Sequence, residues 1–394
     1  MKIVNKYGDK LLFVLTLAFL ATVLFRLWVN RPPAKAVPPS IIFTQWENGS
    51  GGKAILALIE EFESLHSGVK IVVNNKSYED LRRELFSPDG ASSLGDVIAL
   101  DPLWVSELIK REIIESASDP IMFFNNIFYY NIDILREAGY SRPPKSRGEF
   151  LNCVRALTSG NLAGLALGLN GSRGIYDDVF PWIWSSGGRL IENGKPALTS
   201  RPVAESLGFL ATLNSEGLIS PDAFSSDSGK KLEDFVSGRA TFIIAPSSEI
   251  GFIREHLGDE AFGVTSVPLP DNYAGKTFLG AAGWTAAVSS ASAHKDEAAL
   301  FAGFLAEKAP FFSEEAMAGQ GNGFPTAISS ENDVFYSKVL DITTGGELTQ
   351  EFSGLPWTLL EKSFKEELAA LFAGKSSAAE AAAAIQEKWE AILE

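Results

Sequence analysis

Residues 129–144 decide the fold, and their sequence is Tyr129-Tyr130-Asn131-Ile132-Asp133-Ile134-Leu135-Arg136-Glu137-Ala138-Gly139-Tyr140-Ser141-Arg142-Pro143-Pro144. The pattern predicts that a strand over 127–130 turns directly into a short helix. Asp133 is placed to cap that helix, and Leu135 gives it an apolar face. The glycine and the prolines that follow end the helix. The predicted unit is a strand, a turn, a helix and a stiff loop.

Strands and helices alternate on the amino-terminal side of this stretch. The sequence predicts strands over 41–46, 69–73 and 96–100, and it predicts helices over 55–65, 78–86 and 104–113. This βαβα order is typical of a layered α/β lobe with a largely parallel sheet. More helix is predicted beyond residue 144, and a Ser377-x-x-Glu380 capping box begins the last helix.

Length and composition favour a two-lobed globular protein with a small polar ligand. The chain has 394 residues, of which 46% are hydrophobic and 21% charged. A chain of this length is longer than one hydrophobic core usually supports, so two lobes are expected. The formal net charge of -15 argues against a nucleic-acid partner, because phosphate binding needs clustered Lys and Arg.

The few cysteines and histidines argue against disulfides, metals and cofactors. Cys153 is the single cysteine, which excludes an intrachain disulfide and a thiolate zinc site. We expect it to be a small buried hydrophobe on a helix face. His66, His256 and His294 lie far apart in the sequence and show no ligand spacing. No metal and no cofactor are expected.

The amino terminus differs in kind from the rest of the chain. Three lysines within the first ten residues precede an apolar run over 11–25, which Arg26 interrupts. We therefore expect residues 1–30 to be a signal-anchor or transmembrane segment, and residues 31–39 to be a Pro-rich spacer. A small-x-small site at 34–36 leaves cleavage and secretion open, but it lies far beyond the apolar run. An uncleaved anchor with an exported body is favoured.

Two enzyme motifs are absent from the sequence, and one candidate pair of catalytic carboxylates remains. The glycine-rich stretch 49–53 is not a phosphate loop, because Glu47 replaces the first required glycine and Ala54 replaces the Ser or Thr. The sequence contains no Gly-x-Ser-x-Gly elbow. The adjacent carboxylates Asp177 and Asp178 could serve as acid and base, although adjacent acidic residues usually form only a solvated loop.

Aromatic and acidic residues follow the predicted strands at their carboxyl ends. Trp46 ends the first strand, Glu47 follows it, and Asp101 follows the strand over 96–100. Ligands of open α/β sheets bind beyond these ends of the strands. Aromatic rings stack on the apolar faces of sugars, while carboxylates bind the hydroxyls. A tryptophan that fills the core is the alternative for Trp46.

The stretch 129–144 resembles the YNxD...AGxxxPP segment of bacterial extracellular solute-binding proteins that feed ABC importers, the group that contains maltose-binding protein. The order of further motifs extends the resemblance over nearly the whole body. It implies a type II periplasmic-binding-protein-like α/β fold, in which two discontinuous lobes are joined by a multi-strand hinge. The lobes expected are 40–124 plus 275–325, and 125–274 plus 326–394. The resemblance also implies a monomer that works with ABC permease subunits and catalyses no reaction.

The resemblance also assigns ligand contacts. Seven residues fall where the family contacts its ligand: Trp46, Glu47, Asp101, Asn125, Tyr176, Asp177 and Trp357. Trp284, in the returning strand, is a further candidate. The loop after Ala245 lacks an aromatic residue that sugar binders of this kind often supply. A smaller sugar, a polyol or another polar solute therefore competes with an oligosaccharide as the expected ligand.

Two other functions remain open at this stage. The same fold could act as a ligand sensor or accessory binding protein of a membrane receptor. A secreted carbohydrate-active enzyme that uses Asp177 or Asp178 is the third possibility.

Overall fold

The computed structural model describes residues 4–29, 39–46, 51–118, 121–275, 277–308, 334–335, 338–339, 341–342, 346–349 and 351–394. The chain divides into two compact units, Met1–Pro39 and Ser40–Glu394. The first contains helix α1 (Val4–Val29), whose apolar side chains are exposed over 13–26, where side chains are described, with Phe19 at 71%. Within the described residues, no helix reaches the length and hydropathy needed to cross a bilayer.

The first half-sheet of the second unit is built from the amino-terminal strands. Strands β1 (Ser40–Trp46), β2 (Lys70–Lys76) and β3 (Val97–Leu100) pair in parallel in the order β2-β1-β3, as the βαβα pattern predicts. Strand β11 (Thr277–Ser289) then runs antiparallel to β3 and also pairs with β4 (Ile114–Ala117). The sheet is therefore mixed. Its helices are α2 (Gly51–Leu65), α3 (Tyr78–Leu85), α5 (Pro102–Lys110) and α13 (Lys295–Glu307).

The second half-sheet is built around β5 (Met122–Asn131), the strand that leads into residues 129–144. Strand β5 pairs with β9 (Ala240–Pro246) and β10 (Phe262–Thr265), and β9 also pairs with β6 (Ala163–Leu165). The helices of this half are α6 (Ile132–Glu137), α7 (Arg147–Leu157), α10 (Arg201–Ser215), α11 (Ser228–Val236) and α12 (Ile250–Leu257).

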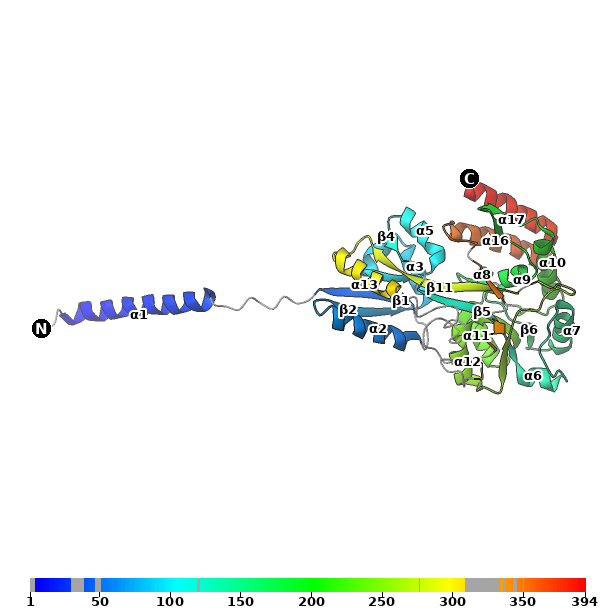
Figure 1. The fold of residues 1–394 in the computed structure, drawn as a ribbon, viewed down its shortest axis with the longest axis horizontal. Helices are drawn as coiled ribbons and strands as arrows, with labels where there is room; N and C mark the ends of the chain where they lie inside the picture. Colours follow the sequence, from blue (N-terminus) through cyan, green and yellow to red (C-terminus); the bar gives the residue numbers. More distant parts are fainter. Residues whose placement is uncertain are drawn as a thin grey trace. The chain divides into compact units, whose positions relative to one another are not determined.

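Two long strands belong to both half-sheets. Residues 122–125 of β5 pair with residues 281–284 of β11, and residues 126–130 of β5 then pair with β9. Both strands run through the middle of the body between the two groups of helices (Figure 1). This arrangement is the predicted two-lobed α/β fold with discontinuous lobes and a multi-strand hinge.

Two carboxyl-terminal helices complete the body. Helix α17 (Ala378–Leu393) packs against α16 (Trp357–Phe372) and α10, as Figure 1 shows. Trp389 Nε1 donates to the Leu360 carbonyl and to Ser363 Oγ, both at 3.0 Å, and so joins α17 to α16. The short elements are α4 (Gly90–Ser93), α8 (Gly174–Asp178), α9 (Phe180–Trp184), η1 (Ser247–Glu249), β7 (Ile191–Glu192), β8 (Lys195–Pro196) and β12 (Gly346–Thr349).

The deciding stretch departs from the prediction at its cap. Asn131, not Asp133, is the N-cap of α6, because β5 continues straight into the helix and leaves Asn131 at the junction. Asn131 Oδ1 accepts a hydrogen bond from the Ile134 amide at 3.1 Å. Asp133 lies in the first turn and forms an exposed ion pair with Arg136 at 2.6 Å.

Cys153 lies where the sequence predicts. It is fully buried on α7, and burial raises the pKa of its thiol to about 12. The thiolate is the reactive form of cysteine, so this thiol is chemically inert at neutral pH.

The capping box of α17 offers a direct test of local stability. The Glu380 amide donates to Ser377 Oγ at 3.3 Å, and Glu380 Oε2 accepts from the Ser377 amide at 2.8 Å. We predict that Ser377→Ala lowers the free energy of unfolding in urea by about 1 kcal/mol, because a helix amide loses its partner. The adjacent Ser376→Ala is the control, since Ser376 Oγ has no hydrogen-bond partner in the described structure. Equal losses in both variants would contradict the capping role.

Candidate functional site

One side of the candidate site lies at the carboxyl ends of β1, β2 and β3. Trp46 ends β1 and packs edge-on against Tyr78, with ring centroids 5.3 Å apart. Tyr78 begins α3 and lies 4.8 Å from the ring of Trp104. Asp101 follows β3 and caps α5, accepting from the Leu103 amide at 2.9 Å and from the Tyr78 hydroxyl at 2.7 Å. The aromatic rings and the carboxylate therefore meet at one edge of the first half-sheet.

The opposite side comes from α8, which packs against β9 of the second half-sheet. Asp177 accepts from Arg173 Nε at 3.2 Å and NH2 at 3.1 Å, and from Asn126 Nδ2 at 2.9 Å. The Arg173 guanidinium lies over the ring of Tyr176 at 4.8 Å from its centroid. Tyr176 in turn packs edge-on against Trp357, with centroids 5.7 Å apart.

A tight loop places Arg173 at this position. A Cβ at Gly174 would collide with the backbone of Gly168 and Leu169, so only glycine lets the loop fold this closely on itself. Arg173 is the residue just before this contact, at the N-cap position of α8. Its side chain therefore leaves the loop toward the first half-sheet.

An ion pair joins the two sides. Arg173 NH1 donates to Asp101 Oδ2, and the two side chains are only 11% and 1% exposed. Burial alone would lower the pKa of Arg173, but the carboxylates of Asp177 and Asp101 raise it well above its usual value. Burial, followed by the charge of Asp101, raises the pKa of Tyr78 well above 10.0. Arg173 is therefore always charged and Tyr78 always a donor.

A second bridge lies beside the first. Arg82 of α3 donates to Ser172 Oγ at 2.8 Å and approaches Glu361 of α16 at 3.4 Å. Glu79 of α3 accepts from the Ser172 amide at 2.8 Å and also from the Ser172 hydroxyl. Burial raises the pKa of Glu361 to about 8, against the opposing charges of Arg82 and Lys365. Burial dominates because Glu361 is 5% exposed.

Five of the eight ligand contacts expected from the sequence lie in this one cluster. They are connected by the contacts above, and they are Trp46, Asp101, Tyr176, Asp177 and Trp357. Trp357 is fully buried against Phe180 and Phe352, so it supports Tyr176 from behind.

The other three expected contacts lie partly or wholly outside the described structure. Glu47 is outside the described residues. Asn125 and Trp284 are described by their backbones alone, which pair with Ala281 and Met122 in the shared part of β5 and β11. Their positions at the hinge are known, and their roles stay predictions.

Sequence reasoning missed several residues of the cluster. Tyr78 follows β2 as Trp46 follows β1, so the rule that selected Trp46 could have selected it. Arg173 lies four residues before Asp177 in a glycine-rich loop, and Arg82 lies on α3 with a partly exposed side chain. Neither shows a signal of its function in the sequence. Asn126 lies next to the expected Asn125, and its side chain reaches Asp177.

Several buried polar atoms around the cluster lack partners. Gln45 Oε1, Asn126 Oδ1, Trp104 Nε1 and Trp357 Nε1 make no hydrogen bond in the described structure. Buried polar groups are normally paired, and leaving one unpaired costs about 1–3 kcal/mol. These atoms are buried in this structure, so they become partners for a ligand only in a conformation that exposes them.

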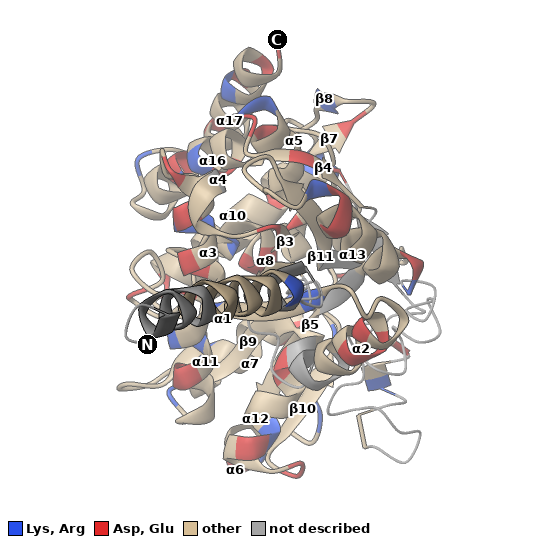
Figure 2. Cartoon of the chain, turned by 90° about the vertical axis from the view of Figure 1, so that its left-hand side faces the viewer, with Lys and Arg blue, Asp and Glu red and all other residues tan. Residues whose placement is uncertain are grey.

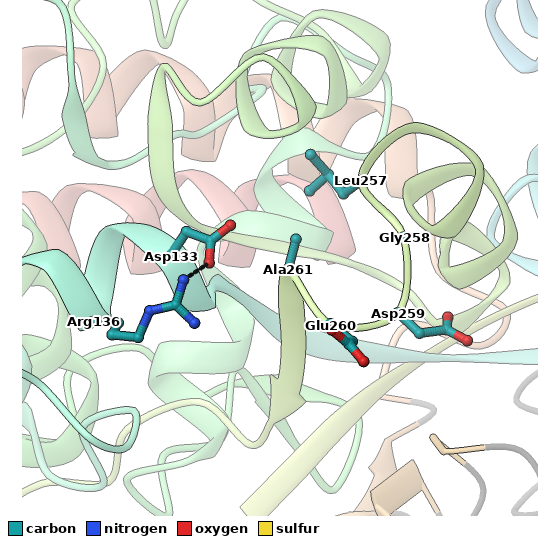
Figure 3. A pocket seen from close by; sticks show the side chains of 7 residues that line it. All are labelled: Asp133, Arg136, Leu257, Gly258, Asp259, Glu260 and Ala261. Atoms are coloured by element: carbon teal, nitrogen blue, oxygen red, sulfur yellow. Dashed lines mark hydrogen bonds and ion pairs between the residues drawn. The ribbon is translucent and has the colours of Figure 1, made fainter.

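A surface hollow elsewhere is a weaker candidate. It lies between α6 and the turn after α12, and Figure 3 shows Asp133 and Arg136 across from the turn Leu257–Ala261. Its ion pair is half-exposed, at 72% for Arg136 and 49% for Asp133. Exposed pairs of this kind contribute little binding energy. Figure 2 shows acidic and basic residues interspersed over the face it draws.

The fold and the cluster together define a two-lobed binding protein of the periplasmic type. The chain matches the profile of the bacterial extracellular solute-binding proteins over residues 46–310, and it belongs to this family. Members of the family bind solutes outside the cytoplasm, and none of the geometry above requires a chemical reaction.

Solved structures of other solute-binding proteins share this fold. A solute-binding protein of Thermotoga lettingae bound to α-D-tagatose has 16% identity and a TM-score of 0.73, covering 90% of this chain and 100% of its own. The GacH receptor of Streptomyces glaucescens, solved unliganded and with acarbose, has 16% identity and a TM-score of 0.70, covering 90% and 98%. An Agrobacterium radiobacter protein with ribitol has 19% identity and a TM-score of 0.67, covering 91% and 100%.

The raised pKa of Glu361 predicts how stability depends on pH. Its folded pKa of about 8 exceeds the usual 4.5, so its contribution is full below about pH 4.5 and is lost as the pH rises through about 8. We predict that the melting temperature of the wild type falls relative to that of Glu361→Gln between about pH 5 and pH 9.

The exposed Glu387→Gln is the matched control, and its difference from the wild type should stay constant over the same pH range. A difference between the wild type and Glu361→Gln that does not change with pH would contradict the assignment.

Proposed function

We propose that this chain is an extracytoplasmic solute-binding protein that captures an uncharged sugar or polyol between its lobes and delivers it to an ABC transporter permease. The proposed lobes are 40–124 plus 275–325, and 125–274 plus 326–394. The boundary at 325 lies outside the described residues. The chain is proposed to act as a monomer, to need no cofactor, and to leave its cargo chemically unchanged.

The side chains at the facing edges of the two half-sheets support this proposal. Trp46 and Tyr78 supply apolar ring faces, and Asp101 and Asp177 supply acceptors for hydroxyl groups. The buried, unpaired Gln45 Oε1 and Asn126 Oδ1 would add partners for hydroxyls in an open conformation that exposes them. A sugar or polyol offers the matching apolar faces and hydroxyls. It would favour the closed state because it contacts both sides at once.

Both carboxylates that a hydrolase would use accept hydrogen bonds from other groups of the protein. Asp178 is fully buried, and its two oxygens accept from Lys231 Nζ at 2.5 Å and from the Gly168 amide at 2.6 Å. Asp177 accepts from Arg173 and Asn126. Both groups therefore hold the second half-sheet and α8 together, which favours binding over chemistry.

Export and tethering complete the proposal. The lysines before the apolar run would stay in the cytoplasm, and residues 1–30 would hold the body at the outer face of the membrane. The Pro-rich residues 31–39 would act as a semi-rigid spacer between the anchor and the body.

Ligand capture is tested with the purified full chain. Calorimetry against a panel of monosaccharides, polyols and oligosaccharides should find a binder. Asp101→Asn should weaken its binding by about tenfold or more, since a charged acceptor becomes a neutral one. Asp133→Asn at the surface hollow is the control and should leave the affinity unchanged. If no compound in the panel binds, or if both variants bind as tightly as the wild type, the proposed site is wrong.

Tethering is tested by fractionating cells that express the full chain. The protein should remain in the membrane pellet after washing with high salt and carbonate, because its anchor is apolar. A chain that begins at Ser40 behind a cleavable signal peptide should appear in the soluble extracytoplasmic fraction. Recovery of the full chain in the soluble fraction would contradict the anchor and favour cleavage at 34–36.

A further inference from the structure

We propose that Arg173 determines the charge specificity of the candidate site by filling the place of a cation between Asp101 and Asp177, which reserves the site for uncharged cargo. The proposal rests on the proposed function in one respect, namely that cargo binds at this site.

The surroundings of Arg173 have the composition of a receptor for an organic cation. Its guanidinium donates to Asp101 on one side and to Asp177 on the other, at 3.1 and 3.2 Å. Its third neighbour is the ring face of Tyr176, at 4.8 Å. Two carboxylates and an aromatic face are the groups that recognise guanidinium and ammonium ions. The side chain is 11% exposed, so these contacts form largely out of water.

The two carboxylates are held in place by partners other than Arg173. Asp101 is fixed by the Leu103 amide at 2.9 Å and the Tyr78 hydroxyl at 2.7 Å. Asp177 is fixed by Asn126 Nδ2 at 2.9 Å. Removing the arginine side chain would therefore leave two buried carboxylates facing each other across an empty space. Such a space strongly favours a cation.

The covalent attachment of Arg173 explains the selectivity. A cationic solute would have to displace a guanidinium that is tethered beside its own carboxylates, at a high effective concentration. A neutral polyol can donate hydroxyl hydrogen bonds to the two carboxylates without displacing the guanidinium. The wild-type site therefore discriminates against cations, and loss of Arg173 should reverse this preference.

Chemical rescue tests the proposal without any knowledge of the cargo. Arg173→Ala removes the atoms of an ethylguanidinium ion, so the probe is ethylguanidinium chloride at about 10 mM, with ethylurea as the neutral probe of similar shape. We expect ethylguanidinium to raise the melting temperature of the full-length variant by about 2 °C or more, and ethylurea to leave it unchanged.

Three controls define the specificity of the rescue. The wild type should not respond, because its site is filled. Arg173→Ala combined with Asp101→Asn and Asp177→Asn should not respond, because the carboxylates are neutralised. Arg142→Ala should not respond either, since the pair of Arg142 with Glu149 is exposed, at 53% and 45%. An equal response in any control, or no response in a folded Arg173→Ala, overturns the proposal.

A second variant covers the case in which Arg173→Ala does not fold. Arg173→Gln is neutral and nearly as long, and methylammonium chloride should raise its melting temperature above the value in sodium chloride of equal concentration. The absence of this rise would overturn the proposal. Because neither experiment uses a sugar, a failed rescue leaves the proposed function standing, and a failed sugar panel leaves the rescue result standing.

Discussion

The contact between Asp101 and Arg173 is the constraint on which the site depends. Asp101 ends a strand of the first half-sheet and caps α5, while Arg173 ends the tight loop before α8. Their contact fastens two bodies that are otherwise continuous through β5 and β11. Because both groups are buried, salt screens their attraction only weakly. Removing Arg173 would leave the Asp101 carboxylate buried without an opposite charge, which is strongly destabilising.

The pairing of Asp101 and Asp177 with Arg173 affects how tightly the proposed site can bind cargo. In the proposed function, Asp101 and Asp177 already have protein partners before cargo arrives, and hydroxyl groups of the cargo would add to these partners. A further gain would come from atoms that lack partners, such as Asn126 Oδ1 and Gln45 Oε1, and from the ring of Trp46. The net free energy of binding is the free energy gained from these new contacts minus that lost from the contacts that the cargo displaces. If this site binds the cargo as proposed, we expect the best ligands to satisfy the unpaired atoms without displacing Arg173.

The sequence predicts the fold better than it predicts the site. Apolar spacing locates β1, β2 and β3, and the same rule brings Trp46 and Asp101 to one edge. The strand signal of β11 is weak at residues 280–283, because glycine and alanine occupy all four positions. Arg173 is missed altogether. Its position depends on a collision-free contact between Gly174 and Gly168, which no periodicity reveals. Pairings across the cleft, such as that of Arg173 with Asp101, likewise have no trace in local sequence.

The shared part of β5 and β11 has a mechanical consequence. Here residues 281–284 pair with residues 122–125, and the sequence of β11 at this point is Ala281-Ala282-Gly283-Trp284. A narrow antiparallel ribbon resists stretching and sliding, because either movement breaks its ladder, but it accepts additional right-handed twist. The two halves of the molecule should therefore rotate as rigid blocks about the axis of this ribbon, with the deformation confined to a few peptide units.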